Sequence, residues 1–303
     1  MQKNLLFKAL LSTVSQTNGL SLFDTLGLLL EEPALDDFSR KYVLEFRDLL
    51  QAFLINKISI ETLFNHEVGG VLFEFFKNFP ISFAEKHIHL SGSLAPEFVW
   101  PRLKVLLDGE NGDVVLAKIR EVYGKDVEVA SVESVKKLIE LDDEGDFAKY
   151  LKILFLPKIV LNSYQAHREA AYFMAKDMYD KYNVASLTLK FTLSRSTKIK
   201  GEQVPGLEDL TPDDVVLGLY DGYMDYQKEN PNFRFTLSPS FRKELDFFDG
   251  DLFESKKESF ESQVMFLVDF LKRHPHLKNV LCEVDTVGDE KSLYRKSHFE
   301  QMR

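Results

Sequence analysis

Residues 85–94, EKHIHLSGSL, contain two histidines separated by one residue, His87 and His89. If residues 81–90 form a strand, its side chains alternate between two faces, so that His87 and His89 point the same way. Two neutral imidazoles on one face can take neighbouring positions around a divalent cation, and zinc is the usual choice for nitrogen ligands. The pattern therefore predicts a strand that ends in two zinc ligands, His87 and His89.

The spacing alone is also compatible with ordinary solvated histidines, because His-x-His occurs by chance. A second such pair, His274 and His276, encloses Pro275 and follows a helix-like run, so it predicts the end of a helix. His87 and His89 instead follow an apolar strand and precede a turn of small residues. This context favours the metal site.

The composition is that of an ordinary globular protein. The chain has 303 residues, of which 45% are hydrophobic and 28% charged, enough for a large core in one or two domains. A net charge of -10 argues against a nucleic-acid polymer as a partner, because binding phosphates requires a basic surface. The single cysteine, Cys282, excludes a disulfide framework and a Cys-x-x-Cys zinc site.

The sequence contains no apolar run of about 18 residues, so no membrane span is expected. The opening apolar stretch is interrupted by Lys8, and no small-residue cleavage pattern of a signal peptide follows it. We therefore expect a cytoplasmic protein without a membrane partner.

The order of periodic segments predicts an α/β fold. Residues 1–80 show helical periodicity and are expected to form a helical N-terminal region, either a packing extension or an element for dimerisation or for a lid. Strands are expected at 81–90, 184–193, 232–238 and 279–285, and helices at 96–107, 114–123, 163–182, 211–228 and 253–272. Regular alternation of strands and helices predicts a parallel sheet with right-handed crossovers.

Three polar features of this pattern receive structural interpretations. The acidic cluster at 142–146 is expected to be the solvated start of a helix rather than a metal site. Thr211-Pro212 with Asp214 is typical of a capped helix start. His167, within the helix 163–182, is expected to face solvent.

Residues 87–94, HIHLSGSL, resemble the adenosine deaminase family, whose first barrel strand ends in His-x-His-Leu-Asp-Gly-Ser-Leu. A second match, DTVGDE at 285–290, resembles the Asp-Leu-Ala-Gly-Asp-Glu that follows the family's fourth strand. The resemblance implies a (β/α)₈ TIM-type barrel, with residues 81–303 as its strands one to four and zinc as its cofactor. It also implies hydrolysis of the 6-amino group of an adenine nucleoside or nucleotide, a small-molecule purine that the backbone of Gly288 would approach.

The match departs from the family at two strands. Ser91 replaces the aspartate that holds the ribose 5′ hydroxyl, and a serine, unlike a carboxylate, does not repel a phosphate. We therefore expect Ser91 and Gly288 to bind a substrate whose 5′ end is modified or phosphorylated. In the second strand, the family's Glu-x-Arg-Phe is replaced by residues 188–191, TLKF.

The second half of the family's site has no counterpart in this sequence. There is no His-Ala-Gly-Glu, no Asp-Asp pair after the fourth strand, and His298 is interpreted as structural. We therefore expect only the N-terminal half of a barrel, without catalytic residues of its own, completed by further chain or by another polypeptide, or assembled as an oligomer. Two alternatives remain open: another metal-dependent hydrolase on the same barrel, and a non-catalytic assembly protein.

Overall fold

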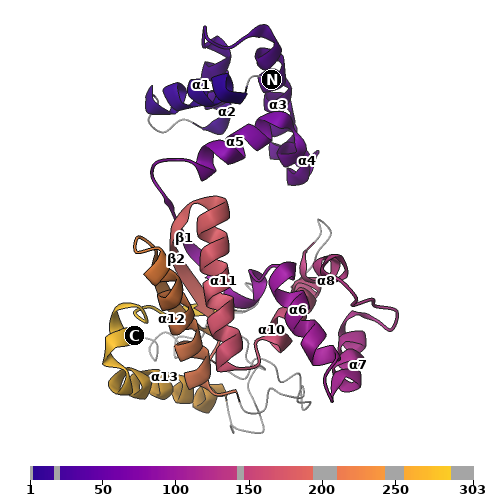
Figure 1. Cartoon of the computed structure of the whole chain (residues 1–303), viewed down its shortest axis with the longest axis vertical. Coiled ribbons are helices and arrows are strands. Elements are labelled where there is room, and N and C mark those ends of the chain that lie inside the picture. Colours follow the sequence, from indigo (N-terminus) through magenta and orange to yellow (C-terminus); the bar gives the residue numbers. More distant parts are fainter. Residues whose placement is uncertain (1–2, 17–20, 142–146, 194–209, 243–255, 288–303) are drawn as a thin grey trace. The chain divides into compact units, whose positions relative to one another are not determined.

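The computed structural model describes residues 3–16, 21–141, 147–193, 210–242 and 256–287 (Figure 1). It divides the chain into two compact units, Met1–Ser82 with Lys181–Asn183 and Phe83–Asp180 with Val184–Arg303. Each unit has a hydrophobic core of its own. None of the described helices combines the length and the apolar character needed to cross a membrane.

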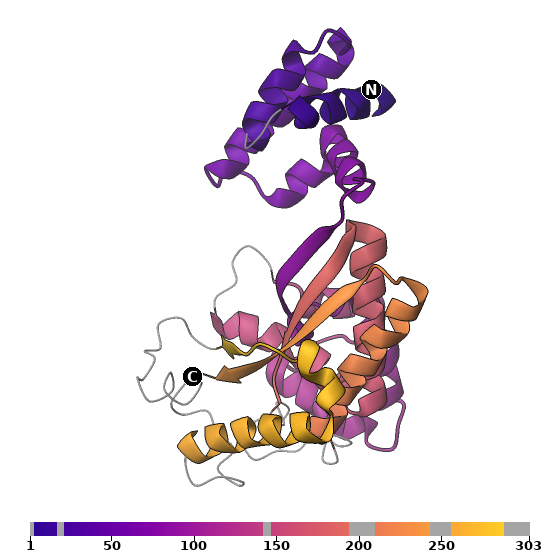
Figure 2. The same cartoon turned by 90° about the vertical axis from the view of Figure 1, so that its left-hand side faces the viewer.

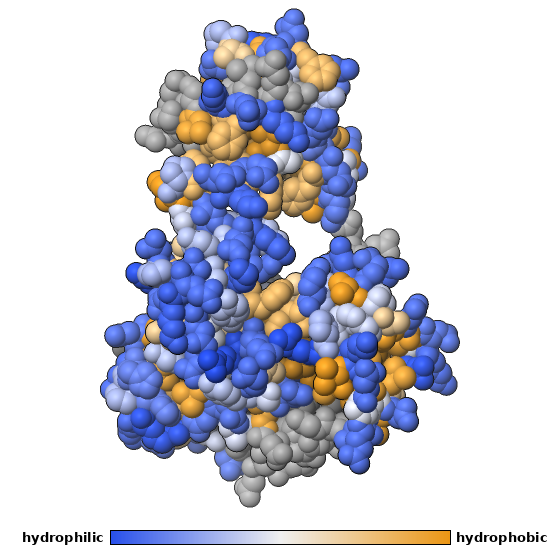
Figure 3. Space-filling view, in the orientation of Figure 1, coloured by the Kyte–Doolittle hydropathy of each residue, from blue (hydrophilic) through white to orange (hydrophobic). Residues whose placement is uncertain are grey.

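The first unit is built from helices. They are α1 (Lys3–Gln16), α2 (Leu22–Glu31), α3 (Asp37–Leu54), α4 (Ile60–Asn65) and α5 (Glu67–Lys77). The N-cap side chains of Ser21 and Asp36 accept backbone N–H groups at the starts of α2 and α3, which fixes where these helices begin. Large apolar side chains remain exposed on this unit, among them Phe38, Leu54 and Phe64. Figure 3 shows apolar surface on the same unit.

The second unit is organised around a parallel sheet. Its strands are β1 (Phe83–His89), β2 (Val184–Phe191), β3 (Arg234–Arg242) and β4 (Asp285–Val287), and they lie in the order β1-β2-β3-β4. A doubly wound sheet would reverse its strand order, whereas a barrel adds each strand next to the previous one. The described strands therefore form one half of a (β/α)₈-type barrel, which confirms the predicted fold class.

Helices connect the strands. The β1–β2 connection contains α6 (Pro96–Leu107), α7 (Gly112–Tyr123), α8 (Val132–Ile139), α9 (Phe147–Ile153), α10 (Phe155–Val160) and α11 (Tyr164–Tyr182). The other two connections contain α12 (Pro212–Glu229) and α13 (Lys256–Arg273). As predicted, Thr211 and Asp214 form a reciprocal capping box at the start of α12. Figure 2 shows α11 and α12 on one side of the sheet.

The two faces of the sheet differ in polarity. Alternate residues of the strands point toward the helices and join the core; they include Ile88, Leu187, Leu189, Phe191 and Leu237. The residues between them are polar and point the other way. We call this set the inner face, and it comprises His87, His89, Thr188, Lys190, Ser238, Ser240 and Asp285. The alternation thus directs the polar chemistry to one side of the sheet.

Helices α11 and α12 pack with almost no space between their backbones. A Cβ on Gly218 would lie 2.5 Å from the carbonyl oxygen of Tyr164, so only glycine fits there. Polar pairs four residues apart bridge the two helices along this contact: Tyr164 with Asp221, Arg168 with Asp225, and Tyr172 with Glu229. The contact holds α11 and α12 against the sheet that they cover.

The expectation that His167 faces solvent is wrong, because its exposed fraction is 3%. The cause is the close approach of α12: a Cβ on Gly218 would lie 2.9 Å from the Cβ of His167. The imidazole Nδ1 is 2.8 Å from the carbonyl oxygen of Ser163, one turn earlier in the chain, and donates to it. His167 is therefore a core histidine with a satisfied donor.

The fourth strand begins later than predicted. Residues Pro275–Asn279 form a 3-10 turn, η2, and the strand starts at Asp285 rather than at residue 279. Leu277 is buried and anchors this turn. Just after the turn, the carbonyl oxygen of Val280 accepts a hydrogen bond from the backbone N–H of Leu237 on β3. The prediction that His274-Pro275 marks a helix end is confirmed, since α13 ends at Arg273. The acidic cluster at 142–146 lies outside the described residues.

Candidate metal centre

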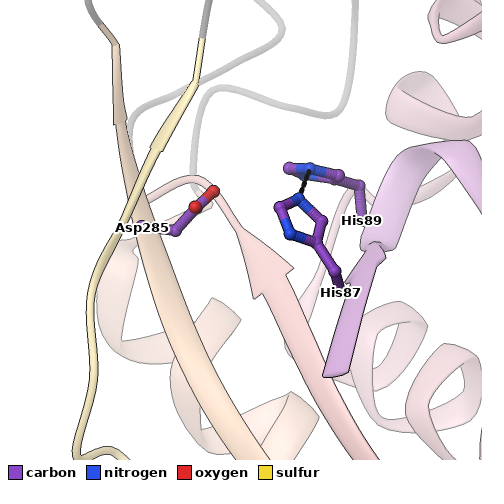
Figure 4. Close-up of side chains that lie close together, drawn as sticks. All are labelled: His87, His89 and Asp285. Carbon is purple, nitrogen blue, oxygen red and sulfur yellow. Dashed lines mark hydrogen bonds between the residues drawn. The ribbon is translucent and has the colours of Figure 1, made fainter. Parts of the chain in front are cut away.

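Strand β1 places two imidazoles side by side at its carboxyl end. The Nε2 atoms of His87 and His89 are 3.1 Å apart, and Figure 4 shows both rings on the same side of the strand. Ile88, between them, is buried in the core on the opposite face. The alternation expected from the sequence is therefore present, and the structure brings these two nitrogens together.

A carboxylate from the other end of the sheet faces this pair. Asp285 is the first residue of β4, and its oxygen lies with the two imidazole nitrogens in a group whose ligand atoms are all within 4.8 Å of one another (Figure 4). Neighbouring strands are about 4.8 Å apart, so a flat sheet would hold the first and fourth strands roughly 14 Å apart. The side chains meet because the sheet curls toward its inner face.

The three side chains fit a divalent metal ion. In a tetrahedral zinc site with bonds of about 2.0–2.1 Å, neighbouring ligand atoms are roughly 3.3 Å apart. The separation of 3.1 Å between the two Nε2 atoms is close to this value, and the Asp285 oxygen lies within 4.8 Å of both nitrogens. Two nitrogens and one oxygen also form a known ligand set for catalytic zinc, with the fourth position left for water or substrate.

Two further side chains hold the Asp285 carboxylate. The Lys190 ammonium from β2 donates to Oδ1 at 2.8 Å, and the Ser240 hydroxyl from β3 donates to Oδ2 at 3.0 Å. The side chains of Lys190 and Asp285 are each only 11% exposed. The carboxylate is therefore held by one partner from the adjacent strand, β3, and by one from β2, the next strand along the sheet.

The surroundings set the protonation states. Burial lowers the pKa of His89, and the nearby charges of His87 and Lys190 lower it further, while Asp285 opposes them. Burial alone would raise the pKa of Asp285, but the hydrogen bonds from Lys190 and Ser240 and the Lys190 charge outweigh it and lower that pKa. A neutral imidazole and an ionised carboxylate result, and these are the forms that bind metals.

Of the two residues predicted to bind substrate, Ser91 and Gly288, the structure describes only one. Ser91 lies in the 3-10 turn η1 (Leu90–Gly92), two residues after His89, and is half-buried. Leu90 is buried and fixes the start of this turn. Gly288 follows Val287, the last residue of β4, and lies outside the described residues. Of the two, only Ser91 therefore lies within the described residues, and its binding of substrate stays a prediction.

Sequence reasoning missed Asp285, Lys190 and Ser240. A signal existed for the first of them, because Asp285 is the acid that begins the DTVGDE motif at the end of a predicted strand. Carboxyl ends of parallel strands meet at one edge of a barrel, so this acid could have been grouped with His87 and His89. Lys190 and Ser240 carry no comparable local signal.

No family model and no curated protein matches this sequence. Among solved structures, the apo structure of the N6-methyl-AMP deaminase from Arabidopsis thaliana is similar over 76% of this chain, with 15% identity and a TM-score of 0.47. The ADAL–IMP complex is similar over the same share, with 15% identity and a TM-score of 0.49. The chain spans about half of the length of each, since 55% of either structure is covered.

Proposed function

We propose that this chain forms the metal-binding part of a zinc-dependent hydrolase that deaminates an adenine nucleoside or nucleotide. One observation carries the proposal: the Nε2 atoms of His87 and His89 are 3.1 Å apart and face Asp285 at the carboxyl edge of a half barrel. The motifs at 87–94 and 285–290, which resemble those of adenosine deaminases, support the purine as the substrate.

In this proposal each side chain has a defined task. His87 and His89 bind the ion through neutral nitrogens, and Asp285 adds an oxygen and a negative charge. When bound, such an ion supplies a water activated as a nucleophile at neutral pH. Lys190 and Ser240 each donate a hydrogen bond to the Asp285 carboxylate. Ser91 and the backbone of Gly288 contact the substrate.

The reaction would exchange the 6-amino group for oxygen. Water adds to C6 of the purine, and ammonia leaves to give the 6-oxo product. This requires a general acid and base, and the sequence contains no His-Ala-Gly-Glu to provide them. We therefore expect these 303 residues alone to bind metal and purine without turnover.

Zinc binding tests the metal site. After removal of bound metals with a chelator, we expect the wild-type chain to take up one zinc ion in a calorimetric titration. His87→Ala and His89→Ala should each abolish this uptake. His276→Ala, from the second His-x-His pair, is the matched control and should retain it. Equal binding by all four proteins, or none by the wild type, would refute the metal site and favour a non-catalytic assembly protein.

The identity of the 5′ group is tested separately with adenosine and adenosine 5′-monophosphate. We expect the zinc-loaded chain to bind the nucleotide more tightly than the nucleoside, because the Ser91 hydroxyl accommodates a phosphate. Ser91→Asp should reverse this preference by charge repulsion. Zinc binding without affinity for either purine would instead favour another metal-dependent hydrolase.

A further inference from the structure

The carboxylate that completes the candidate metal centre is already bound to a cation. Lys190 donates to Asp285 Oδ1 at 2.8 Å, and Ser240 donates to Oδ2 at 3.0 Å. Both members of the ion pair have side chains that are only 11% exposed, so bulk water screens their attraction little. Any metal ion that binds His87, His89 and Asp285 therefore meets this ammonium.

The strand register explains why the ammonium is there. His89 is aligned with Lys190 on β2, Lys190 with Ser238 on β3, and Ser240 with Asp285 on β4. Lys190 is thus on β2, between β1 and β3, and its side chain lies on the inner face that also carries His89. Its long side chain reaches past β3 to the carboxylate. The lysine belongs to the same row of side chains as the candidate ligands.

We propose that Lys190 is a built-in competitor for the metal, so that a divalent ion binds Asp285 only when the Lys190–Asp285 pair opens. The inference rests on the proposed metal site and adds a residue that sets its affinity. A divalent ion and an ammonium on one buried carboxylate repel each other, because the surrounding dielectric is low. The ammonium must therefore withdraw when the ion arrives.

The inner face offers the withdrawn ammonium a new partner. Ser238 is fully buried, and its Oγ has no hydrogen-bond partner among the described residues. It is the register neighbour of Lys190 on β3, so it lies within the reach of a lysine that releases Asp285. A buried hydroxyl without a partner is costly, and accepting the ammonium would remove that cost.

A purely orienting role for Lys190 predicts the opposite effect on metal affinity. Residues that orient metal ligands through hydrogen bonds typically weaken metal binding about 10- to 100-fold when they are removed. Removal of a competitor tightens binding instead. The sign of the change therefore decides between the two roles.

The experiment compares zinc affinities, measured by competition with a chromophoric chelator, in the wild type and in Lys190→Gln, Lys190→Met and Lys190→Arg. We expect zinc to bind about tenfold more tightly to the Gln and Met variants, and the charge-retaining Arg variant to stay close to the wild type. Gln keeps a hydrogen-bond donor for Asp285, so it remains informative if the Met variant does not fold. Unchanged or weaker binding by the Gln variant would overturn the proposal.

A second pair of variants ties the effect to the carboxylate. In an Asp285→Asn background, Lys190→Gln should no longer change zinc affinity, because the competition is for Asp285. A change of the same size in both backgrounds would contradict the proposal. If the wild type binds zinc through His87 but Lys190→Gln weakens that binding, only this inference fails. If neither the wild type nor any Lys190 variant binds zinc, the inference and the proposed metal site both fail.

Discussion

The carbonyl oxygen of Arg168 lies 2.1 Å from the place that a Cβ on Gly222 would occupy. The same hypothetical atom would be 2.9 Å from the Cβ of Ala171. These distances belong to backbone and to a short side chain, so neither neighbour can rotate away. The close contact between α11 and α12, the two helices that pack on the sheet, therefore requires glycine at position 222.

Gly222→Ala should therefore destabilise the second unit. Overpacking in a close contact typically costs about 1–3 kcal/mol, and we expect the upper end of this range because the backbone itself obstructs the methyl group. Urea unfolding followed by circular dichroism measures the loss. Lys228→Ala on the same helix is the control, since its side chain is 71% exposed and should change the free energy of unfolding by less than about 0.5 kcal/mol. Equal effects of the two substitutions would contradict the packing described here.

The buried imidazole of His167 should make stability depend on pH. Burial lowers its pKa, and the hydrogen bond to the Ser163 carbonyl and the charge of Asp214 oppose this only in part. The unfolded chain therefore binds more protons at this position than the folded one, so stability is present above the ordinary histidine pKa and is lost as the pH falls below it.

His167→Gln removes this titration. Urea midpoints measured between about pH 5 and pH 7.5 should fall toward acid more steeply for the wild type than for the variant. An NMR titration of the His167 ring gives an independent measurement, in which its pKa should lie below the ordinary value. Parallel pH profiles for the two proteins would mean that His167 does not contribute.

Local pattern was sufficient to predict the strand that carries the histidines. His87 and His89 share a face because alternation is a property of any strand, and the capped start of α12 follows from Thr211 and Asp214 alone. Burial of His167 depends instead on a glycine 51 positions later in the sequence, Gly218, which lets another helix approach. No pattern within one helix carries that information.

The meeting of Asp285 with His87 and His89 could likewise not be predicted from local sequence. Asp285 meets His87 and His89 only because the sheet curls, and curvature arises from the packing of all four strands rather than from any one of them. In the sequence, Lys190 is only a departure from a family motif, whereas the strand register aligns it with His89. Contacts across strands were therefore the part that the sequence alone could not supply.

The Lys190–Asp285 pair should be far more sensitive to the loss of one partner than to the loss of both. Removing one member of a buried ion pair leaves an uncompensated charge and costs about 3–5 kcal/mol, whereas an apolar replacement of both is often close to neutral. In the presence of a chelator that removes metals, we expect Asp285→Leu to lower the free energy of unfolding by about 3 kcal/mol. Adding Lys190→Met should restore most of it.

The control for this cycle is Lys176→Met, which disrupts the exposed pair with Asp180, where the two side chains are 55% and 50% exposed. An exposed pair contributes at most about 1 kcal/mol, so this variant should remain close to the wild type. If Asp285→Leu is as stable as this control, loss of the carboxylate leaves no costly buried charge behind, and the prediction fails. If the double variant is no more stable than Asp285→Leu alone, the cost comes from Asp285 packing on β4, and the ion pair does not hold β2 and β4 together.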